Sequence, residues 1–234
     1  MEQWEVPEFL KEKLKAQYGE ELTERILKGY TRERPVTFRV NTLKATEGKI
    51  KKCLEEEGIS YSQAAWSREA MIVEKVREPV VEKLPVYEAG EIYLQSLSSM
   101  IPVLALAPAK GESVLDMAAA PGGKTTQMAA VSENMASITA CEKNKIRAER
   151  LLYNIEKQGA SRVFVMTVDA RRLDDFFLFD KVLLDAPCTG SGTLDMCRKD
   201  SGSRLTEEAL KRSAKLQEEL HLKAQQHIKP GHDM

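Results

Sequence analysis

Four acidic side chains between residues 116 and 185 each follow a short apolar segment. They are Asp116, Glu142, Asp169 and Asp185. One such acid usually only caps a strand or forms a turn. If the four segments are parallel strands of one sheet, however, the acids converge on a single crevice, because ligands of such sheets bind at the carboxyl ends of the strands. Glu142, after the second strand, is then well placed to bind ribose hydroxyls.

A loop with two glycines, Ala118-Ala-Ala-Pro-Gly-Gly-Lys-Thr125, follows the first acid. Glycines let the backbone approach a ligand closely, and the next helix presents free N–H groups. The loop resembles the end of a P-loop, G-x-x-x-x-G-K-[ST], but Ala118 replaces the first glycine and Asp116 would repel phosphate. A ligand with a cationic centre and an amino group, such as S-adenosylmethionine, suits this site better. A P-loop nucleotide hydrolase is the less favoured alternative.

A third motif, Asp185-Ala-Pro-Cys-Thr-Gly-Ser-Gly192, contains the cysteine with most chemical promise. Free cysteines are mostly small buried hydrophobes, and a reactive one needs a lowered thiol pKa. Cys188 follows a proline at a strand end, beside an acid, so we select it as a candidate catalytic residue together with Asp185. Cys53 and Cys141 lie in apolar patterns and are predicted to be structural, whereas Cys197 is ambiguous.

The sequence shows no pattern of metal ligands. No two cysteines form a C-x-x-C, so we predict no zinc site. The three histidines, His221, His227 and His232, lie in the last 14 residues and are interpreted as surface residues.

The elements that must position these groups alternate between strand and helix. We expect strands at 113–117, 137–141, 162–168 and 181–185, helices at 98–106, 125–131 and 145–158, and a last helix capped by Thr206. This alternation predicts a parallel, doubly wound α/β sheet of the Rossmann-like kind.

The first ~90 residues are predicted to form a smaller α/β unit. Its expected elements are a helix at 7–28 interrupted near Gly19, a strand at 35–41, a helix at 47–57 and a strand at 70–76. Residues 25–52 hold nine basic and two acidic residues, a net charge of +7. Such a cluster is either a solvated face or a surface for nucleic-acid phosphates.

Composition excludes several classes of protein. The chain has 234 residues with a net charge of −1, 42% hydrophobic and 30% charged, which is typical of a globular protein with one large domain or two small ones. It contains no apolar run long enough for a membrane span and no signal peptide at its first residues. Four cysteines do not make a disulfide framework, so we expect a cytoplasmic location.

Four motifs together are similar to those of one known family. They are Arg39-Val-Asn-Thr-Leu-Lys44, Gln95-Ser-Leu-Ser-Ser-Met100, Asp116-Met-Ala-Ala-Ala-Pro-Gly-Gly-Lys-Thr125 and Asp185-Ala-Pro-Cys-Thr-Gly-Ser-Gly192. In this order they closely resemble the Sun (Nol/Nop) family of RNA 5-methylcytosine methyltransferases. The resemblance extends over about residues 5–230.

The resemblance implies a role for each candidate residue. S-adenosyl-L-methionine would be bound by Ala118, Ala119, Ala120, Pro121, Gly122, Gly123, Lys124, Glu142, Arg147, Asp169 and Asp185. Within this set, Glu142 would take the ribose hydroxyls with Arg147 nearby, Asp169 would read the adenine, and Asp185 would lie between cofactor and cytosine. Residues 1–88 would form an N-terminal RNA-binding domain that includes Arg39 and Asn41, and residues 89–234 the methyltransferase domain. The RNA would be ribosomal or transfer RNA.

The implied chemistry needs a thiolate. Carbon 5 of cytosine is a poor nucleophile until a thiolate adds to carbon 6, after which carbon 5 can take the sulfonium methyl group. In this family the cysteine matching Cys188 is associated with product release, and the attacking cysteine belongs to a later Thr-Cys motif. In DNA cytosine methyltransferases the Pro-Cys motif itself supplies the nucleophile, so local sequence leaves both roles open for Cys188.

The chain departs from the family pattern after Lys229-Pro-Gly231, because no Thr-Cys pair is present. We therefore expect a C-terminally truncated chain, and a binding fragment without transfer activity is the alternative function. The family's strand order 3-2-1-4 would leave the apolar fourth strand at an open edge. We expect self-association there, with the oligomeric state otherwise undetermined.

Overall fold

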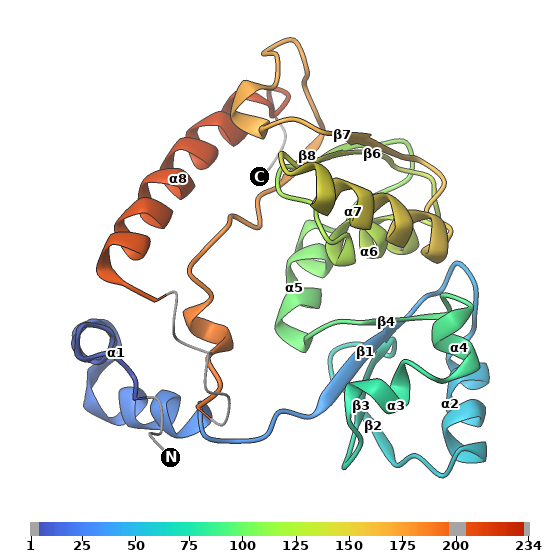
Figure 1. Ribbon diagram of the computed structural model, residues 1–234. Coiled ribbons are helices and arrows are strands. Elements are labelled where there is room, and N and C mark those ends of the chain that lie inside the picture. Colours follow the sequence, from blue (N-terminus) through green and yellow to red (C-terminus); the bar gives the residue numbers. More distant parts are fainter. Residues whose placement is uncertain (1–4, 197–204, 232–234) are drawn as a thin grey trace. The chain divides into compact units, whose positions relative to one another are not determined.

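The computed structural model describes residues 5–196 and 205–231 of the chain, and Figure 1 shows its elements in chain order. The chain divides into two compact units. The first consists of Met1–Arg34 and Pro187–Glu218, and the second of Pro35–Ala186 and Glu219–Met234. The long helix α8 (Glu207–Gln226) has residues in both units.

The first unit is built around helix α1 (Glu8–Gly29). Gly19 has φ 76° and ψ 175° and breaks the helical geometry, as the sequence predicted near this glycine. The chain segment after the Pro-Cys motif forms the short 3-10 helix η2 (Ser191–Thr193). A small apolar core joins α1 to that segment and consists of Val6, Leu10, Tyr30, Leu194 and Leu205.

The second unit begins with a four-stranded antiparallel sheet of order β2-β3-β1-β4. Its strands are β1 (Val36–Val40), β2 (Tyr61–Gln63), β3 (Ala70–Val73) and β4 (Ile92–Leu94). Its helices are α2 (Glu47–Glu56), α3 (Glu78–Val81) and α4 (Pro85–Glu88). The sequence predicted β1, α2 and β3, but it missed β2 and β4, which have only three residues each.

The same unit continues with a parallel sheet of order β7-β6-β5-β8. Its strands are β5 (Ser113–Asp116), β6 (Ser137–Cys141), β7 (Val163–Met166) and β8 (Lys181–Leu183). Val114 of β5 pairs with Ile138 on one side and with Lys181 on the other. The parallel Rossmann-like sheet and the strand order 3-2-1-4 expected from the sequence are therefore confirmed.

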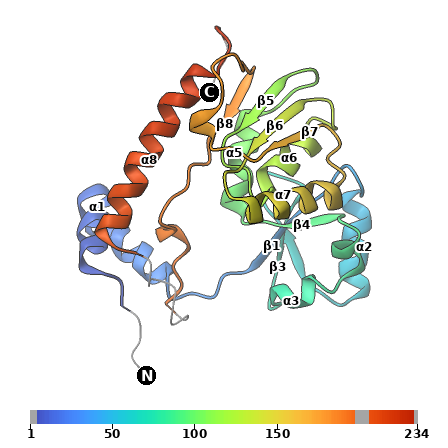
Figure 2. The same ribbon diagram turned by 45° about the horizontal axis from the view of Figure 1, so that its top comes forward.

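Three helices lie between the two sheets in both views, namely α5 (Leu97–Leu106), α6 (Gly123–Val131) and α7 (Lys145–Gln158) (Figures 1 and 2). Helix α7 has the bounds that the sequence predicted, because both ends carry local signals. The Asn144 side chain accepts the N–H of Arg147, and Gly159 adopts a left-handed conformation with φ 72°. The 3-10 helix η1 (Ala170–Arg172) follows β7.

Two buried polar side chains of the motif at 39–44 connect the antiparallel sheet to the half of this unit that contains the parallel sheet. Asn41 is 1% exposed and donates from Nδ2 to the carbonyls of Gly90 and Gln158, both at 2.8 Å. Arg39 is 3% exposed and donates from Nη2 to Oγ1 of Thr126 at 3.2 Å. The expectation that Arg39 and Asn41 serve an RNA-binding surface is therefore wrong, because both are buried in the protein.

The basic cluster at 25–52 is divided between the two units. Its members up to Arg34 belong to the first unit and the rest to the second. Of the latter, Arg39 is buried and Lys44 donates to the backbone carbonyls of Ala89 and Lys157. The lysines of α2 form ion pairs with acids, namely Lys49 with Glu91, Lys51 with Glu47 and Lys52 with Glu56. Most of its charge in the second unit is thus already compensated.

Within the part of the chain that the structure describes, no helix combines the length and the apolar character needed to cross a bilayer.

Replacement of Asn41 by alanine is expected to destabilise the protein. The carbonyls of Gly90 and Gln158 would lose a buried donor, so the free energy of unfolding should fall by about 3 kcal/mol. Denaturant titration measures this change. Gln63→Ala is the matched control, because at a half-buried position it removes the side-chain bonds to the Arg68 carbonyl and from Lys51, and it should cost about 1 kcal/mol or less. Equal effects of the two variants would contradict the account.

Candidate functional site

The four acids lie at one edge of the parallel sheet. Asp116 is the last residue of β5, and Glu142 directly follows β6. Asp169 and Asp185 follow β7 and β8 by three and two residues. Because the strands are paired in parallel, all four carboxylates belong to the carboxyl edge, where ligands of such sheets bind.

The loop between β5 and α6 is shaped by its two glycines. Gly122 has φ 109°, a backbone conformation that residues with a side chain rarely adopt. A Cβ at this position would lie 2.9 Å from Cδ1 of Leu151. A Cβ on Gly123 would lie 3.1 Å from the ring of Tyr93. Position 122 therefore needs glycine for its conformation, whereas a side chain at position 123 would require the Tyr93 ring to shift by a few tenths of an ångström.

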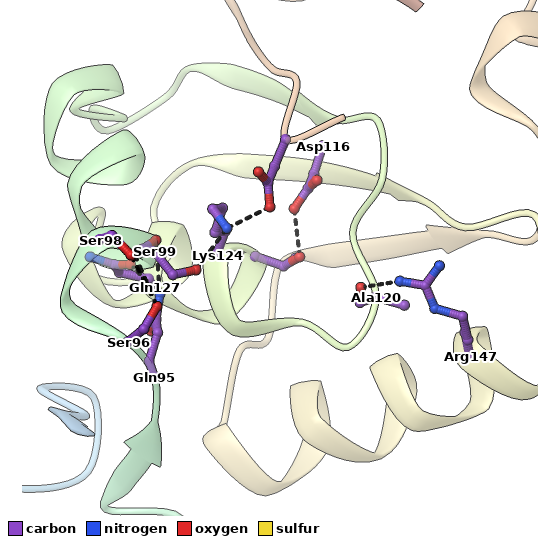
Figure 3. A network of polar contacts seen from close by, with 11 residues as sticks. Gln95, Ser96, Ser98, Ser99, Asp116, Ala120, Lys124, Gln127 and Arg147 are labelled. Carbon is purple, nitrogen blue, oxygen red and sulfur yellow. Dashed lines mark hydrogen bonds and ion pairs between the residues drawn. The ribbon is translucent and has the colours of Figure 1, made fainter. Parts of the chain in front are cut away.

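Helix α7 holds the outer side of this loop. Arg147 donates from Nη2 to the carbonyl of Ala120 at 2.7 Å, as Figure 3 shows. Asn154, two turns further along the helix, donates to the carbonyl of Pro121 at 2.8 Å. The loop is thus tied to the element that follows the neighbouring strand β6.

A cavity of about 240 Å³ lies against the inner side of the loop. Its lining comes from β4, the start of α5, the glycine loop and the end of β8. The lining residues are Tyr93, Leu94, Gln95, Ser96, Ser99, Asp116, Ala118, Ala119, Ala120, Pro121, Gly123, Lys124 and Asp185. Most of the expected cofactor-binding loop therefore faces one cavity together with two of the four acids.

Asp116 lies at the bottom of this cavity as a buried carboxyl, 1% exposed. Burial raises its pKa from 3.8 to about 6, and the hydrogen bond from Thr125 Oγ1 at 2.7 Å opposes this shift. The carboxyl is thus poised to interact with a cationic or hydrogen-bond-donating ligand group.

Lys124 connects two walls of the cavity. Its ammonium donates to Oδ2 of Asp185 at 2.6 Å and to Oγ of Ser99 at 2.7 Å (Figure 3). The Lys124 side chain is 14% exposed, whereas that of Asp185 is 56% exposed. Asp185 is therefore an accessible carboxylate, oriented by a cation that is largely buried.

The side chain of Gln95 connects Ser99 to Gln127 and Arg39 by hydrogen bonds. Its Nε2 donates to the Ser99 carbonyl at 3.1 Å and to Oε1 of Gln127 at 3.0 Å, and its Oε1 accepts from Arg39. Sequence reasoning quoted the motif at 95–100 but assigned no site residue within it. Gln95 and Ser99 were missed because only the tertiary packing of α5 against α6 brings them to Lys124 and Gln127.

Glu142 is 4% exposed and is held by the start of α7. One carboxylate oxygen accepts the N–H of Asn144 at 2.8 Å, and the other lies 3.3 Å from Nη1 of Arg147. Arg147 thus contacts both Glu142 and the Ala120 carbonyl, which brings two predicted cofactor residues to the same loop.

Asp169 has a different environment. Hydrogen bonds from the Arg171 side chain lower its pKa to about 2, and the Nη2–Oδ2 distance is 2.5 Å. Arg171 also pairs with Glu219 of α8 at 2.5 Å. Asp169 is therefore a firmly ionised carboxylate, already neutralised by a neighbour, at the far strand of the sheet.

A family comparison decides what kind of protein this is. The profile described as 16S rRNA methyltransferase RsmB/F matches residues 103–234, and a profile described as an RsmF/B-like ferredoxin-like domain matches residues 6–78. The chain belongs to the RsmB/F methyltransferase family. The ferredoxin-like match covers most of the antiparallel sheet, and the other covers the parallel sheet with its glycine loop.

Individual relatives agree with this assignment. The chain is 40% identical over 164 residues to the 25S rRNA (cytosine-C(5))-methyltransferase nop2 of Schizosaccharomyces pombe, covering 69% of this chain and 27% of that protein. It is 42% identical over 119 residues to a tRNA (cytosine(72)-C(5))-methyltransferase of Pyrococcus horikoshii, covering 50% of this chain and 31% of that protein. The chain thus spans only about a quarter to a third of the length of these relatives.

A solved structure shows the same fold. The crystal structure of a methyltransferase homologue from Pyrococcus horikoshii superposes with a TM-score of 0.83 at 33% identity, over 97% of this chain and 71% of that one.

The cysteines and histidines of this RsmB/F family member are placed as follows. Cys188 belongs to the first unit, is exposed, and accepts the N–H of Gly190 on Sγ at 3.4 Å. Cys141 is buried, and burial raises its pKa to about 12, so the prediction of a structural cysteine is confirmed. Cys53 is half-buried, and burial raises its thiol pKa as well. Cys197 lies outside the described residues.

The interpretation of His227 as a surface residue is wrong. Its side chain is fully buried, packs against Phe179, and makes a 2.8 Å hydrogen bond from Nδ1 to the Phe177 carbonyl. His221 is exposed, and His232 lies outside the described residues. No group of three or more metal-ligating side chains gathers within residues 5–196 and 205–231.

Asp116→Asn is expected to stabilise the protein in a pH-dependent way. Burial favours the neutral form of this carboxyl, so its pKa is higher in the folded than in the unfolded protein. Its contribution to stability is fully present below the unfolded pKa of 3.8 and is lost as pH rises through about 6. The variant has no such titration, so its stability relative to wild type should rise by about 2 kcal/mol between pH 4 and pH 7.

Denaturant titration of both proteins across this range measures the difference. Asp174→Asn, at an exposed aspartate, is the control and should show no such trend. A difference between Asp116→Asn and wild type that stays constant with pH would contradict the raised pKa.

Proposed function

We propose that this chain carries the cofactor-binding and cytosine-binding core of an RNA methyltransferase that transfers a methyl group from S-adenosyl-L-methionine to carbon 5 of cytosine. The observation that supports it most is the cavity in which the loop at 118–124 faces Asp116 and the Lys124–Asp185 pair. The names of the relatives, which act on cytosine C5 of ribosomal and transfer RNA, support the same reaction.

The residues present fit S-adenosylmethionine. Glycines at 122 and 123 keep the loop backbone open where a Cβ would collide with Leu151 and Tyr93. We assign the loop at 118–124 to the methionine part, Glu142 with Arg147 to the ribose hydroxyls and Asp169 to the adenine. When bound, the cofactor supplies an electrophilic methyl group on a sulfonium centre, whose positive charge suits Asp116 and Asp185.

The residues of this chain would act on the cytosine as follows. Asp185, oriented by Lys124, is accessible and would hydrogen-bond to the ring, or transfer to it a proton that Asp185 first takes up, while a thiolate forms a bond to carbon 6. The electron pair released onto carbon 5 would then form the bond to the methyl group as the bond between this methyl group and the cofactor sulfur breaks, which leaves a neutral thioether. Loss of the carbon 5 proton to a solvent base would expel the thiolate and restore the ring. The target base must be unpaired or flipped out for this sequence.

Cys188 is our candidate for the thiolate, since it is an exposed free cysteine three residues after Asp185. A binding function without transfer is the alternative, because the chain contains no Thr-Cys pair to supply the attacking cysteine of its family pattern. In both cases we propose that residues 1–88 serve RNA binding and residues 89–234 bind the cofactor. The free thiols Cys53, Cys141 and Cys188 support a cytoplasmic location.

Cofactor binding is tested by calorimetric titration of the full chain with S-adenosylmethionine. We expect Glu142→Gln to weaken the affinity about tenfold or more, because the charged acceptor for the ribose hydroxyls is lost. Glu149→Gln removes an exposed acid from the same helix and is the matched control, expected to leave affinity unchanged. Binding of a nucleoside triphosphate in place of S-adenosylmethionine would contradict the proposal.

An assay of methyl transfer distinguishes the methyltransferase function from binding without transfer. With tritiated S-adenosylmethionine and transcript RNA, incorporation that is abolished by Cys188→Ser would assign nucleophilic attack to Cys188. Incorporation that Cys188→Ser leaves intact would contradict that role. Binding of RNA and S-adenosylmethionine without incorporation of the labelled methyl group would support the alternative of binding without transfer.

Strand β8 gives a further expectation about partners. It is the outer strand of the parallel sheet in the described residues, and it contains the buried pair Val182 and Leu183. Only Phe179, before the strand, forms a bridge on that side, with Ile228. We expect self-association through this edge, so sedimentation should show mass increasing with concentration. Leu184→Lys should reduce it, and a monomer at all concentrations would contradict the expectation.

A further inference from the structure

One exposed stripe of α7 combines cations with apolar side chains. Along the chain its members are spaced three, four, three and four residues apart, which places them on one side of a helix. They are Lys143, just before the helix, and Ile146, Arg150, Tyr153 and Lys157. The helix buries a different side, formed by Ala148, Leu151, Ile155 and Gln158. Apart from Lys157, which is half-buried and packs on the Tyr87 ring, the stripe is therefore not needed for the packing of α7.

Lys143, the first cation of this stripe, is placed unfavourably for the helix dipole, whereas Lys157 in the last turn is placed favourably. Helix N-termini favour acids, yet α7 has no acid in its first turn, where Lys145 and Arg147 lie, and Lys143 directly precedes its N-cap residue. Arg147 is compensated by Glu142, but neither Lys143 nor Arg150 forms an ion pair with a described acidic residue. A local feature that disfavours the fold without compensation is expected where it serves binding.

The apolar members are unusually exposed. Ile146 is 65% and Tyr153 63% exposed. The ammonium of Lys157 lies 6.0 Å from the Tyr153 ring centroid and 4.0 Å from that of Tyr87. An exposed aromatic ring between cations is the arrangement with which proteins bind single-stranded nucleic acid, the ring stacking on a base and the cations binding phosphates.

The stripe lies on the same rigid element as the cofactor loop. Helix α7 holds the loop through Arg147 and Asn154, as described above. At its start, Lys143 lies close enough to Asp169 to add to the larger effect of Arg171 in lowering that carboxyl's pKa. At its other end, the Lys157 carbonyl accepts a hydrogen bond from Lys44, which lies within the ferredoxin-like match at 6–78. The stripe thus extends from the carboxyl edge of the sheet toward the antiparallel sheet.

We propose that the stripe Lys143–Ile146–Arg150–Tyr153–Lys157 binds an unpaired RNA segment that flanks the target cytosine. Lys143 and Arg150 contact phosphates, and Tyr153 stacks on a base. This proposal rests on the proposed function, since it names the surface by which that function holds its RNA. It also gives the RNA a surface outside the basic cluster at 25–52, whose charge in the second unit is mostly compensated.

The test measures the affinity of the full chain for a fluorescein-labelled single-stranded RNA containing cytosine, by fluorescence anisotropy at several salt concentrations. The double variant Lys143→Glu/Arg150→Glu should bind about tenfold or more weakly and show a shallower salt dependence. The matched control is Lys110→Glu, an exposed lysine that precedes β5 at the opposite edge of the sheet. It should bind within about twofold of wild type.

Tyr153 provides a second, charge-neutral test. Tyr153→Ala should weaken RNA binding about fivefold or more, whereas Tyr153→Phe keeps the ring and should bind like wild type. Equal losses in both variants would contradict stacking.

Calorimetry with S-adenosylmethionine on the same variants separates this inference from the proposed function. Unchanged cofactor affinity with weakened RNA affinity supports the inference. Wild-type RNA affinity in the double variant and in Tyr153→Ala would overturn it while leaving the proposed function intact. A wild-type chain that binds neither RNA nor S-adenosylmethionine would overturn both, and preferential binding of an acidic peptide at the stripe would overturn the RNA assignment.

Discussion

Strand β5 is hydrogen-bonded to a parallel neighbour on each side, β6 and β8, and the groups of the crevice depend on this pairing for their positions. Parallel register brings the carboxyl ends of all four strands to one edge. Asp116 ends the central strand, so the loop that follows it emerges between the flanking acids Glu142 and Asp185. A strand inserted between β5 and either neighbour would separate these groups by a strand spacing, about 4.8 Å, and divide the cavity.

The glycine loop adds a second constraint, because its backbone conformation is held from both sides. On one side, Arg147 and Asn154 of α7 donate hydrogen bonds to the carbonyls of Ala120 and Pro121. On the other side, the Tyr93 ring packs beside Gly123. Arg39 supports the first turn of α6 through Thr126. The half that contains the antiparallel sheet therefore acts on the cavity through buried polar contacts, which explains why Arg39 and Asn41 of the motif at 39–44 are buried.

The sequence predicted the parallel half of the fold well and the small half only partly. Helix α7 and strand β6 were found with their bounds because Asn144, Gly159 and an apolar run mark them locally. Strands β2 and β4 are too short to have a periodic signal and are set by pairing with β3 and β1. The strand-end acids were found from spacing alone, whereas Gln95 and Ser99 depend on how α5 packs. The burial of Arg39, Asn41 and His227 is likewise a tertiary effect that local patterns do not contain.

We propose that the loop at 118–124 and the acid after β6 form one S-adenosylmethionine site. Hydrogen–deuterium exchange of the full chain with and without S-adenosylmethionine would detect this site. We expect slower exchange of the amides at 118–124 and 142–147 on addition of the cofactor, with little change in the antiparallel sheet at β2 and β3. Exchange at both segments that S-adenosylmethionine leaves unchanged at saturating concentration, or protection confined to other segments, would contradict it.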